Sequence, residues 1–293
     1  MNNATASHPL LPLSNALAAL VRDAGRSVVG VHSQRSRASG WFWRPQLIVT
    51  ASDALADEGP IHVTLPGGDR VEATLKGRDA STDIALLRVD RADTAPATVS
   101  ADAVAAGAMT VVVGAAEGAP TAALGIVSRA GAGWRSLRGG DMGPRIELDI
   151  ALRASAEGGV VVDAGGLAIG MAVFGPRKRV LVIPAATIER VASQLERDGR
   201  IARGYLGLGL QPVRLEGGGE GAMVMSVDAT GPGAAAGVRQ GDIVVGWNGQ
   251  PLRGVAIVRE LGPGSVDAVV RVSATRAGEP VEFSVTIGAR PDA

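Results

Sequence analysis

The sequence predicts a mostly β protein, built as a barrel or a sandwich. Short apolar runs rich in valine recur along the chain, separated by turn signals such as Pro66-Gly67-Gly68 and Asp163-Ala164-Gly165-Gly166. The chain also carries 41 glycines, which favours many turns. Almost no helical pattern lies between the runs, and this argues against an alternating parallel α/β fold.

The elements can be placed in order. Leu13 to Ala24 has helical spacing, with Ser14 as the expected N-cap and Gly25 as the stop. A second helix is predicted over 185–198, where Ile188, Val191 and Leu195 share one face. Between them, the predicted strands occupy residues 27–33, 40–52, 61–68, 70–79, 83–90, 109–115, 123–131, 145–152, 158–175 and 179–185.

Composition excludes several classes of function. The 29 basic and 29 acidic residues give no net charge, which argues against a nucleic-acid binder. Cysteine is absent, which excludes disulfides, thiolate metal sites and a cysteine nucleophile. No apolar run is long enough to span a bilayer, so we expect no transmembrane segment. The N-terminus lacks a basic region before its apolar stretch, and this absence of a signal predicts a cytoplasmic location.

After residue 200 the sequence pattern changes to strands with one short helix and turns. We therefore predict a tail over 1–12, a first domain over 13–200 and a small second domain over 201–293. The second domain resembles a PDZ domain of the bacterial HtrA type. The run "GPGAAAGVRQGDIVVGWNGQPL", from Gly231 to Leu252, carries the resemblance together with the loop Tyr205-Leu206-Gly207-Leu208. The resemblance implies that this loop binds a peptide carboxylate and that a groove helix follows over 255–261, with Val255 and Val258 also contacting the peptide.

The first domain resembles the trypsin-like protease domain of the same family, a double β-barrel. The resemblance rests on "ASGWFW", "LIVTASDAL", "STDIALLRVD", "ALGIVS" and "IELDIALRASAEGGVVVDAGGLAIGM". It implies three catalytic positions. The base lies in "LIVTASDAL", the acid lies in "STDIALLRVD", and the serine nucleophile directly precedes the double glycine of the last stretch. Here these positions hold Asp53, Asp83 and Glu157.

Two of the three catalytic residue types are therefore missing. An aspartate with a pKa near 4 is a poor base for a serine, and Glu157 is no serine nucleophile. The family's oxyanion hole would use the backbone N–H groups of Ser155 and Glu157, and we expect the Glu157 carboxylate to fold into that hole. The resemblance places Asn-Pro-Gly-Asn before the nucleophile, where this chain has Arg-Ala-Ser-Ala over 153–156, so we also expect a different backbone geometry in this loop. His8, His32 and His62 do not fall at the base position. Three converging carboxylates should raise at least one pKa, with Arg153 as the nearest cationic partner in sequence.

These residues predict a catalytically inactive HtrA-like protein that binds unfolded or C-terminal peptide segments through its PDZ domain, as a scaffold, adaptor or chaperone-like partner. One alternative is an active serine-type endopeptidase of protein quality control with an unusual site. Another is a carboxylate- or metal-dependent activity at Asp53, Asp83 and Glu157. No cofactor and no nucleic-acid partner are expected. The resemblance implies a homo-oligomer, such as a trimer, and a periplasmic or extracytoplasmic location, against the location expected from the N-terminus.

Overall fold

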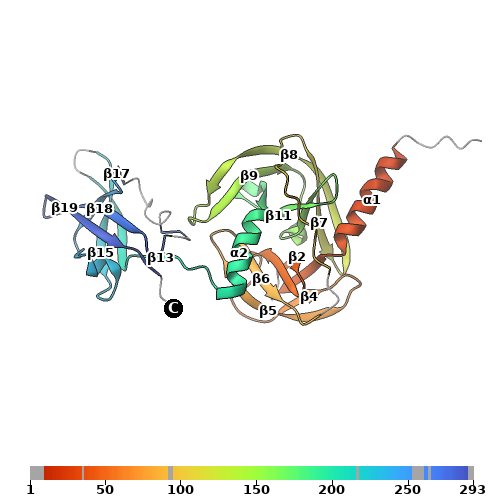
Figure 1. Ribbon diagram of the computed structural model, residues 1–293, viewed down its shortest axis with the longest axis horizontal. Coiled ribbons are helices and arrows are strands. Elements are labelled where there is room, and N and C mark those ends of the chain that lie inside the picture. The colour runs from red at the N-terminus through yellow and green to blue at the C-terminus, as the bar shows by residue number, and fades with distance from the viewer. Residues whose placement is uncertain are drawn as a thin grey trace, which may run out of the picture. The chain divides into compact units, whose positions relative to one another are not determined.

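The computed structural model describes residues 10–34, 36–91, 95–215, 218–252, 261–262 and 265–289. The chain forms two compact units (Figure 1). The first comprises Met1–Trp134 and Met142–Arg200, and the second Arg135–Asp141 and Ile201–Ala293. No helix in the described ranges is both long enough and apolar enough to cross a membrane.

The first helix, α1 (Leu11–Gly25), begins earlier than the sequence predicts. Leu10 is its N-cap and makes no side-chain capping bond, so the expected cap at Ser14 is wrong. Ser14 lies inside the helix, and its N–H donates to the Leu10 carbonyl at 3.0 Å. Pro12 explains the earlier start, because proline has a helical φ and lacks only an N–H that the first turn does not use.

Six strands close into the first barrel in the order β1-β2-β3-β6-β5-β4. They are β1 (Val28–Ser33), β2 (Ser36–Arg44), β3 (Leu47–Ala51), β4 (Ile61–Thr64), β5 (Arg70–Asp79) and β6 (Ile84–Arg88). The single run expected over 40–52 is therefore two strands. Gln46 turns the chain between them at a φ of 65°, next to Pro45, which has no N–H for a ladder. Trp41, Phe42 and Ile48 are buried at 0–1% exposure, and both faces of β2 are therefore covered at this point.

Six further strands close the second barrel in the order β10-β11-β12-β9-β8-β7. They are β7 (Met109–Ala116), β8 (Ala119–Arg135), β9 (Asp141–Asp149), β10 (Val160–Asp163), β11 (Ala168–Phe174) and β12 (Val180–Pro184). Read around the ring from β7, this order repeats that of the first barrel from β1. The mostly β double barrel expected from the sequence is thus confirmed.

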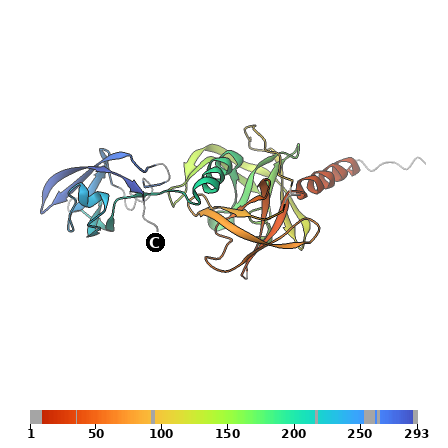
Figure 2. The ribbon, with the colours of Figure 1, turned by 60° about the horizontal axis from the view of Figure 1, so that its bottom comes forward.

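Helix α2 (Ala185–Asp198) covers strands of both barrels, including β5, β6, β11 and β12 (Figure 2). Its bounds match the predicted ones, and Gly199 ends it in the left-handed region at a φ of 69°. Ile188, Val191 and Leu195 are at most 1% exposed, as the spacing predicts. The helix is therefore part of the core of the first unit.

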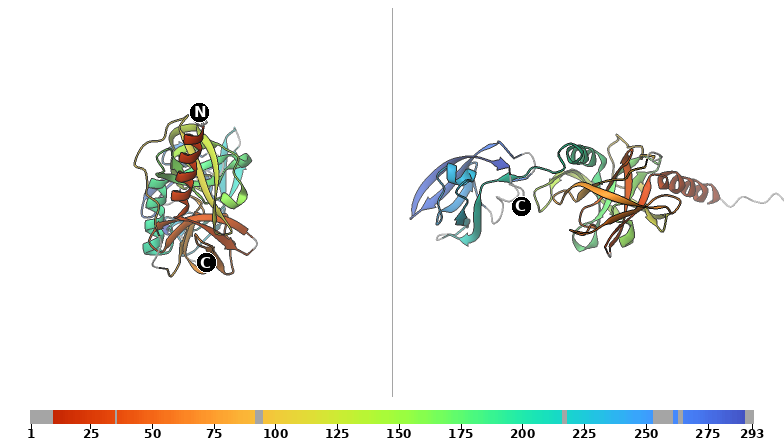
Figure 3. Two further views of the ribbon diagram at one scale, coloured as in Figure 1. Left: turned by 90° about the vertical axis from the view of Figure 1, so that its right-hand side faces the viewer. Right: turned by 90° about the horizontal axis from the view of Figure 1, so that it is seen from below.

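The second unit is a sheet in the order β14-β15-β16-β18-β19, with β17 beside β16 and a separate pair of β13 and β20. The strands are β13 (Gly204–Tyr205), β14 (Leu208–Arg214), β15 (Glu220–Val227), β16 (Ile243–Trp247), β17 (Gln250–Pro251), β18 (Val269–Arg276), β19 (Glu279–Thr286) and β20 (Gly288–Ala289). One short helix, α3 (Pro232–Ala235), precedes β16. Figure 3 shows β18 and β19 in blue as one long curved hairpin.

A buried ion pair ties this second unit together. Asp242 is 1% exposed, and both of its carboxylate oxygens accept bonds from Arg276, at 2.8 and 2.9 Å. The Arg239 N–H donates to the same carboxylate at 2.8 Å. Bonding to Arg276 holds the pKa of Asp242 below its ordinary value, so this carboxylate stays ionised inside the unit.

Leu195→Ala tests whether α2 is integral to the barrels. Leu195 is 0% exposed, so we expect the change to lower the free energy of unfolding of the first unit by about 2–5 kcal/mol. Arg197→Ala, at an exposed position of the same helix, is the control. The measurement is denaturant unfolding followed by tryptophan fluorescence. Equal effects of the two changes would contradict the integral role of α2.

Candidate functional site

The loop that joins β9 to β10 contains a single turn of 3-10 helix, η1 (Ala154–Ala156). Glu157 is the residue that caps the end of this turn. The Ala156 N–H donates to the Arg153 carbonyl at 2.9 Å, and the Glu157 N–H donates to the Ala154 carbonyl at 3.1 Å. The Gly159 N–H continues this pattern with the Ala156 carbonyl at 3.0 Å. The backbone leading to Glu157 is therefore held by bonds within the loop itself.

The double glycine after Glu157 is required by close packing against both barrels. Gly158 has a φ of 80°, and a Cβ there would lie 2.2 Å from the Ser39 carbonyl oxygen and 2.9 Å from Thr50 Oγ1 in the first barrel. A Cβ on Gly159 would lie 2.6 Å from the Val113 carbonyl oxygen in the second barrel. These glycines allow the loop to enter the seam between the barrels.

Ser39, which the sequence analysis did not single out, fixes this loop in place. It is 0% exposed, its N–H donates to the Glu157 carbonyl at 2.7 Å, and its hydroxyl donates to the Ser155 carbonyl at 2.7 Å. The same hydroxyl accepts the N–H of Ala115 on β7 at 2.9 Å. One buried side chain on β2 thus connects the first barrel, the Glu157 loop and the second barrel. The signal in the sequence is its place in "ASGWFW", which the resemblance covered.

Asp53 and Asp83 are brought together by strand pairing. Ala51 on β3 pairs with Ile84 on β6, so the residues just beyond these strand ends face each other. The Asp53 N–H donates to Asp83 Oδ1 at 2.7 Å, and the Ser52 N–H donates to the Asp83 carbonyl at 3.2 Å. The expected convergence of these two positions is therefore present in the structure.

Asp83 has an unusual backbone conformation that its neighbours maintain. Its φ is 57°, a region that costs energy for residues other than glycine. The turn before it is built on Asp79, which is 4% exposed. The Asp79 carboxylate accepts the Ser81 N–H at 3.0 Å, the Ser81 hydroxyl at 2.6 Å and the Thr82 hydroxyl at 2.8 Å. Asp79 positions Asp83, a role that sequence reading did not assign to it.

Glu157 is half-buried, and its Oε1 accepts the N–H of Phe174, the last residue of β11, at 3.3 Å. Burial raises the pKa of this carboxyl, the negative charge of Asp53 raises it further, and the bond from Phe174 opposes the rise. Asp53 is thus near enough to both other acids to interact with each. The Glu157 side chain spans from the loop to β11 and occupies the space between them.

The hydrogen bonds at the expected oxyanion hole differ from our expectation. The Glu157 carboxylate does not accept the Glu157 loop amides. Instead, the Ala154 carbonyl accepts the Glu157 N–H. Because the C=O and N–H of a trans peptide point in opposite directions, the Ala154–Ser155 peptide then turns the Ser155 N–H away from the Glu157 N–H. The two donors that an oxyanion hole needs do not converge on one point.

The other candidate groups lie elsewhere. His32 and His62 face each other across β1 and β4, and the His32 ring lies 2.9 Å from Thr64 Oγ1. His8 lies outside the described residues. Arg153 forms no ion pair with any residue in the described ranges. No group of three or more His, Asp or Glu side chains among the described residues is placed to hold one metal ion.

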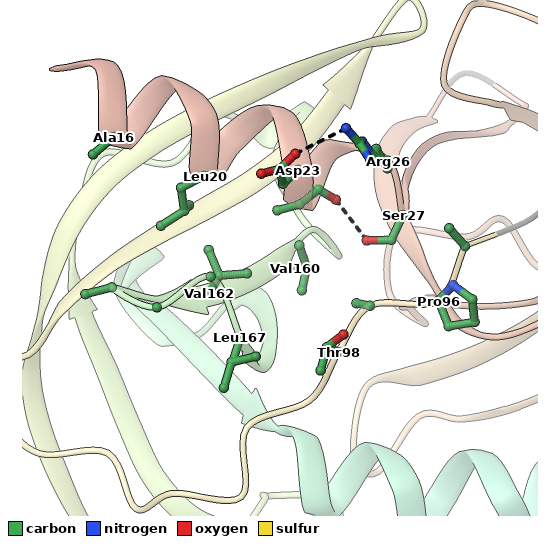
Figure 4. A pocket seen from close by; sticks show the side chains of 16 residues that line it. Ala16, Leu20, Asp23, Arg26, Ser27, Pro96, Thr98, Val160, Val162 and Leu167 are labelled. Carbon is green, nitrogen blue, oxygen red and sulfur yellow. Dashed lines mark hydrogen bonds and ion pairs between the residues drawn. The ribbon is translucent and has the colours of Figure 1, made fainter. Parts of the chain in front are cut away.

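A pocket of about 370 Å³ lies beside α1, between Leu20 of the helix and Val160, Val162 and Leu167 (Figure 4). Its lining includes none of the three triad-equivalent acids. At its rim, Asp23 and Arg26 of the helix end form an exposed ion pair at 3.4 Å. This pocket is therefore separate from the candidate catalytic locus.

In the second unit, the loop between β13 and β14 has its carbonyls turned into the protein. The Leu206 carbonyl accepts the Gly233 N–H and the Gly207 carbonyl accepts the Asp228 N–H, both at 2.7 Å. Gly207 has a φ of 72°. Within the described ranges, the N–H groups of Leu206 and Gly207 donate to no backbone carbonyl, so this loop presents two adjacent donors.

A pocket of about 250 Å³ adjoins these donors, and β14 is an edge strand of the described sheet. Leu208, Leu210 and Tyr205 line it, together with Arg203, Gly204, Leu206, Gly207 and Leu261. Leu206 is 4% exposed and packs in the core, so its side chain has a structural role beside its place in the pocket lining. Val255 and Val258, on the expected groove helix, lie outside the described residues.

Two family models match the chain. Residues 38–171 match a trypsin-like peptidase domain, and residues 204–287 match a PDZ domain. These ranges contain the Asp53, Asp83 and Glu157 locus and the Tyr205–Leu208 loop, respectively.

Similar proteins carry the same combination. A DegP-like periplasmic serine endoprotease of Rhizobium meliloti is 30% identical over 278 residues, covering 88% of this chain and 54% of that protein. A DegP-like relative from Chlamydia pneumoniae is 28% identical over 272 residues, covering 87% and 55%. The chain thus spans about half the length of the curated relatives it matches.

Solved structures agree with this assignment. The serine endoprotease from Yersinia pestis matches with a TM-score of 0.70 and 25% identity, covering 93% of this chain and 97% of that one. The HtrA-type protease AlgW, solved with a decapeptide, matches with a TM-score of 0.69 at 22% identity, covering 94% and 99%, and supports the fold. The chain is similar in sequence and fold to the DegP/HtrA serine endoproteases, and it combines a trypsin-like peptidase domain with a PDZ domain.

Proposed function

We propose that this chain is a catalytically inactive DegP/HtrA homologue that binds polypeptide segments through its PDZ domain. The observation that carries the first part is Glu157 at the position of the nucleophile, with its own N–H bonded to the Ala154 carbonyl. A carboxylate next to Asp53, with no histidine at the base position, cannot repeat the proton transfer that activates a serine. The Ala154 carbonyl also engages the Glu157 N–H, so this donor does not stabilise an oxyanion. That stabilisation is the second contribution to catalysis that the site lacks.

The loop sequence supports the same conclusion. Opening the hole requires the Ala154–Ser155 peptide to flip, which rotates φ of Ser155 out of its ordinary negative range. Glycine adopts such values readily and serine does so at a cost. Ser155 stands where the family resemblance places a glycine, so this chain favours the closed loop independently of Glu157.

The binding part of the proposal rests on the second unit. Two adjacent N–H donors, a pocket lined by leucines and an edge strand are the elements by which a sheet takes up an extended peptide with a carboxylate end. A protein of the same fold, the HtrA-type protease AlgW, was solved with a decapeptide, which is in keeping with a peptide ligand. Because the curated relatives are named as periplasmic, we also propose an extracytoplasmic location.

The first test is cleavage of dye-labelled casein by the purified chain. We expect none from the wild type, and little from the double variant Asp53→His with Glu157→Ser, because the hole stays closed. Adding Ser155→Gly to this double variant should raise the cleavage rate by about tenfold or more, since an oxyanion donor contributes about 10²–10³ in rate. Labelling by a fluorophosphonate reports the activated serine in each variant.

The competing view is an active endopeptidase with an unusual site, as the names of the relatives suggest. Cleavage by the wild type that disappears in both Glu157→Ala and Asp53→Ala would establish that view and overturn our proposal. A peptidase contaminant would leave cleavage unchanged in both variants.

Glu157→Gln tests the state of the buried carboxyl. Because the pKa of Glu157 in the folded chain lies above its ordinary value, the folded state holds this proton more tightly than the unfolded chain. The stability that this proton provides is present below about pH 4.5 and is lost as the pH rises through the raised pKa. We therefore expect the variant and the wild type to melt together near about pH 4, and the variant to melt higher near about pH 8.

The control for this measurement is Glu117→Gln, at an exposed glutamate of the same unit. Differential scanning calorimetry across the pH range gives the melting temperatures. A difference between wild type and Glu157→Gln that is largest in acid would contradict the burial of an ionisable carboxyl at this site.

Peptide binding is tested with a C-terminal peptide library, followed by fluorescence anisotropy with an enriched sequence. Leu208→Asp places a charge in the pocket, and we expect it to weaken binding by about tenfold or more. Val269→Asp, at a position 65% exposed in the same unit, is the control. An amidated peptide should lose affinity as well, because the loop donors then lack their carboxylate. No enriched sequence, or equal binding by both variants, would overturn the binding proposal.

A further inference from the structure

A group of basic side chains gathers on the second barrel, outside the Glu157 locus. Arg129 on β8, Arg145 on β9 and Arg179 just before β12 all approach the carboxylate of Glu147. The distances from their guanidinium nitrogens to its oxygens are 3.6, 2.5 and 3.5 Å, in that order. Together with the two residues that precede Arg179 in the β11–β12 connection, we call them the basic cluster: Arg129, Arg145, Arg177, Lys178 and Arg179.

One carboxylate is shared among three guanidinium groups, which leaves two positive charges in excess at this point. Glu147 is only 10% exposed and is engaged mainly by Arg145, which also stacks over the Trp134 ring at 4.8 Å. Arg129 and Arg179 reach it only at distances longer than a good hydrogen bond, and their side chains are 61% and 54% exposed. Both therefore present donors to the solvent.

Arg177 and Lys178 add two further charges on the same connection. Both are exposed, at φ values of 60° and 57°. Neither forms an ion pair with any residue that the structure describes. Their positive φ values belong to the tight turn between β11 and β12, which is closed by its own backbone bonds, including the Arg179 N–H to the Pro176 carbonyl at 3.4 Å. The two charges are therefore carried, exposed and without an ion pair, on an ordered turn.

The cluster is continuous in the chain with the Glu157 locus. Phe174, whose N–H is bonded to Glu157, is followed directly by the connection over 175–179 that carries three of the cationic side chains. The Gly175 N–H closes this connection by donating to the Arg179 carbonyl at 2.7 Å. A polypeptide that lies along the end of β11 would therefore meet the basic cluster next.

We propose that the basic cluster is a docking surface for an acidic segment of a partner polypeptide, rich in Asp or Glu. Planar guanidinium groups match carboxylates in paired hydrogen bonds, and Glu147 already shows this chemistry within the chain. The whole chain has no net charge, with 29 acidic residues, so a long nucleic acid would meet repulsion around the cluster. A short acidic segment matches the local excess without that repulsion.

The test uses the full chain and a fluorescein-labelled peptide of alternating Glu and Gly with an amidated C-terminus, at low salt, followed by anisotropy. Arg177→Gln with Lys178→Gln should weaken binding by about 5- to 10-fold, since two exposed charge pairs are lost. The matched control is Arg22→Gln with Arg197→Gln, which changes the net charge equally at exposed positions elsewhere. Binding should also weaken steeply as salt is added.

A second variant moves affinity in the opposite direction. Glu147→Gln removes the internal carboxylate that competes for Arg129 and Arg179, so we expect tighter binding of the acidic peptide, by about 2- to 5-fold. Circular dichroism melting verifies that this variant is folded. A purely structural role for the cluster would give no gain in affinity.

Three outcomes would overturn the proposal. They are no binding of the acidic peptide at low salt, equal loss of binding in the test and control double variants, and equal or tighter binding of a single-stranded oligonucleotide of the same charge. None of these results depends on the PDZ domain, because the probe ends in an amide. Failure here therefore leaves the proposed peptide binding by the second unit unaffected.

Discussion

The hydrogen bonds of Ser39 hold the centre of the first unit together. Its backbone and hydroxyl bond to Glu157, Ser155 and Ala115, and so connect β2, the Glu157 loop and β7. Gly158 must lie against the same residue, which leaves no room for a side chain there. This packing does not depend on which residue stands at 157. The position of the loop between the barrels is therefore set by backbone contacts, whichever side chain stands at 157.

The sequence predicted much of this architecture, because the determining signals are local. Valine-rich runs and turn residues indicate strands, and the spacing of Ile188, Val191 and Leu195 indicates α2 with its observed bounds. The misplaced start of α1 arose because Ser14 is a good cap in isolation, whereas Pro12 permits the helix to begin earlier. The split at Gln46 was missed although Pro45, which has no N–H for a ladder, is a sequence signal for a break in the run. The positive φ of Gln46 itself has no such signal.

The sequence predicted which residues stand at the candidate site, but it did not predict the hydrogen bonds that they make. Matching motifs placed Asp53, Asp83 and Glu157, and strand pairing brings the first two together. The direction of the Ala154 carbonyl was not predicted, although Ser155 at a glycine position of the resembled family is a signal for it. The role of Ser39 depends on partners that become neighbours only in the folded chain, 116 residues away in the case of the Ser39–Ser155 bond. The bonds of Asp79 are local, to Ser81 and Thr82, but that this turn positions Asp83 is evident only in the structure. The basic cluster has the same origin, since Arg129, Arg145 and Arg179 come from three separate stretches.

The edge strand β14 contains Pro212, which pairs with Ala222 on β15 and has no N–H to offer to a further strand. An incoming chain could therefore pair with the residues of β14 that precede Pro212. At Pro212 it would find no backbone N–H to bond to. A short guest strand fits within this limit, whereas a second copy of a long strand does not. The proline thus limits the edge-to-edge pairing of sheets, which is the route by which exposed edge strands lead to aggregation.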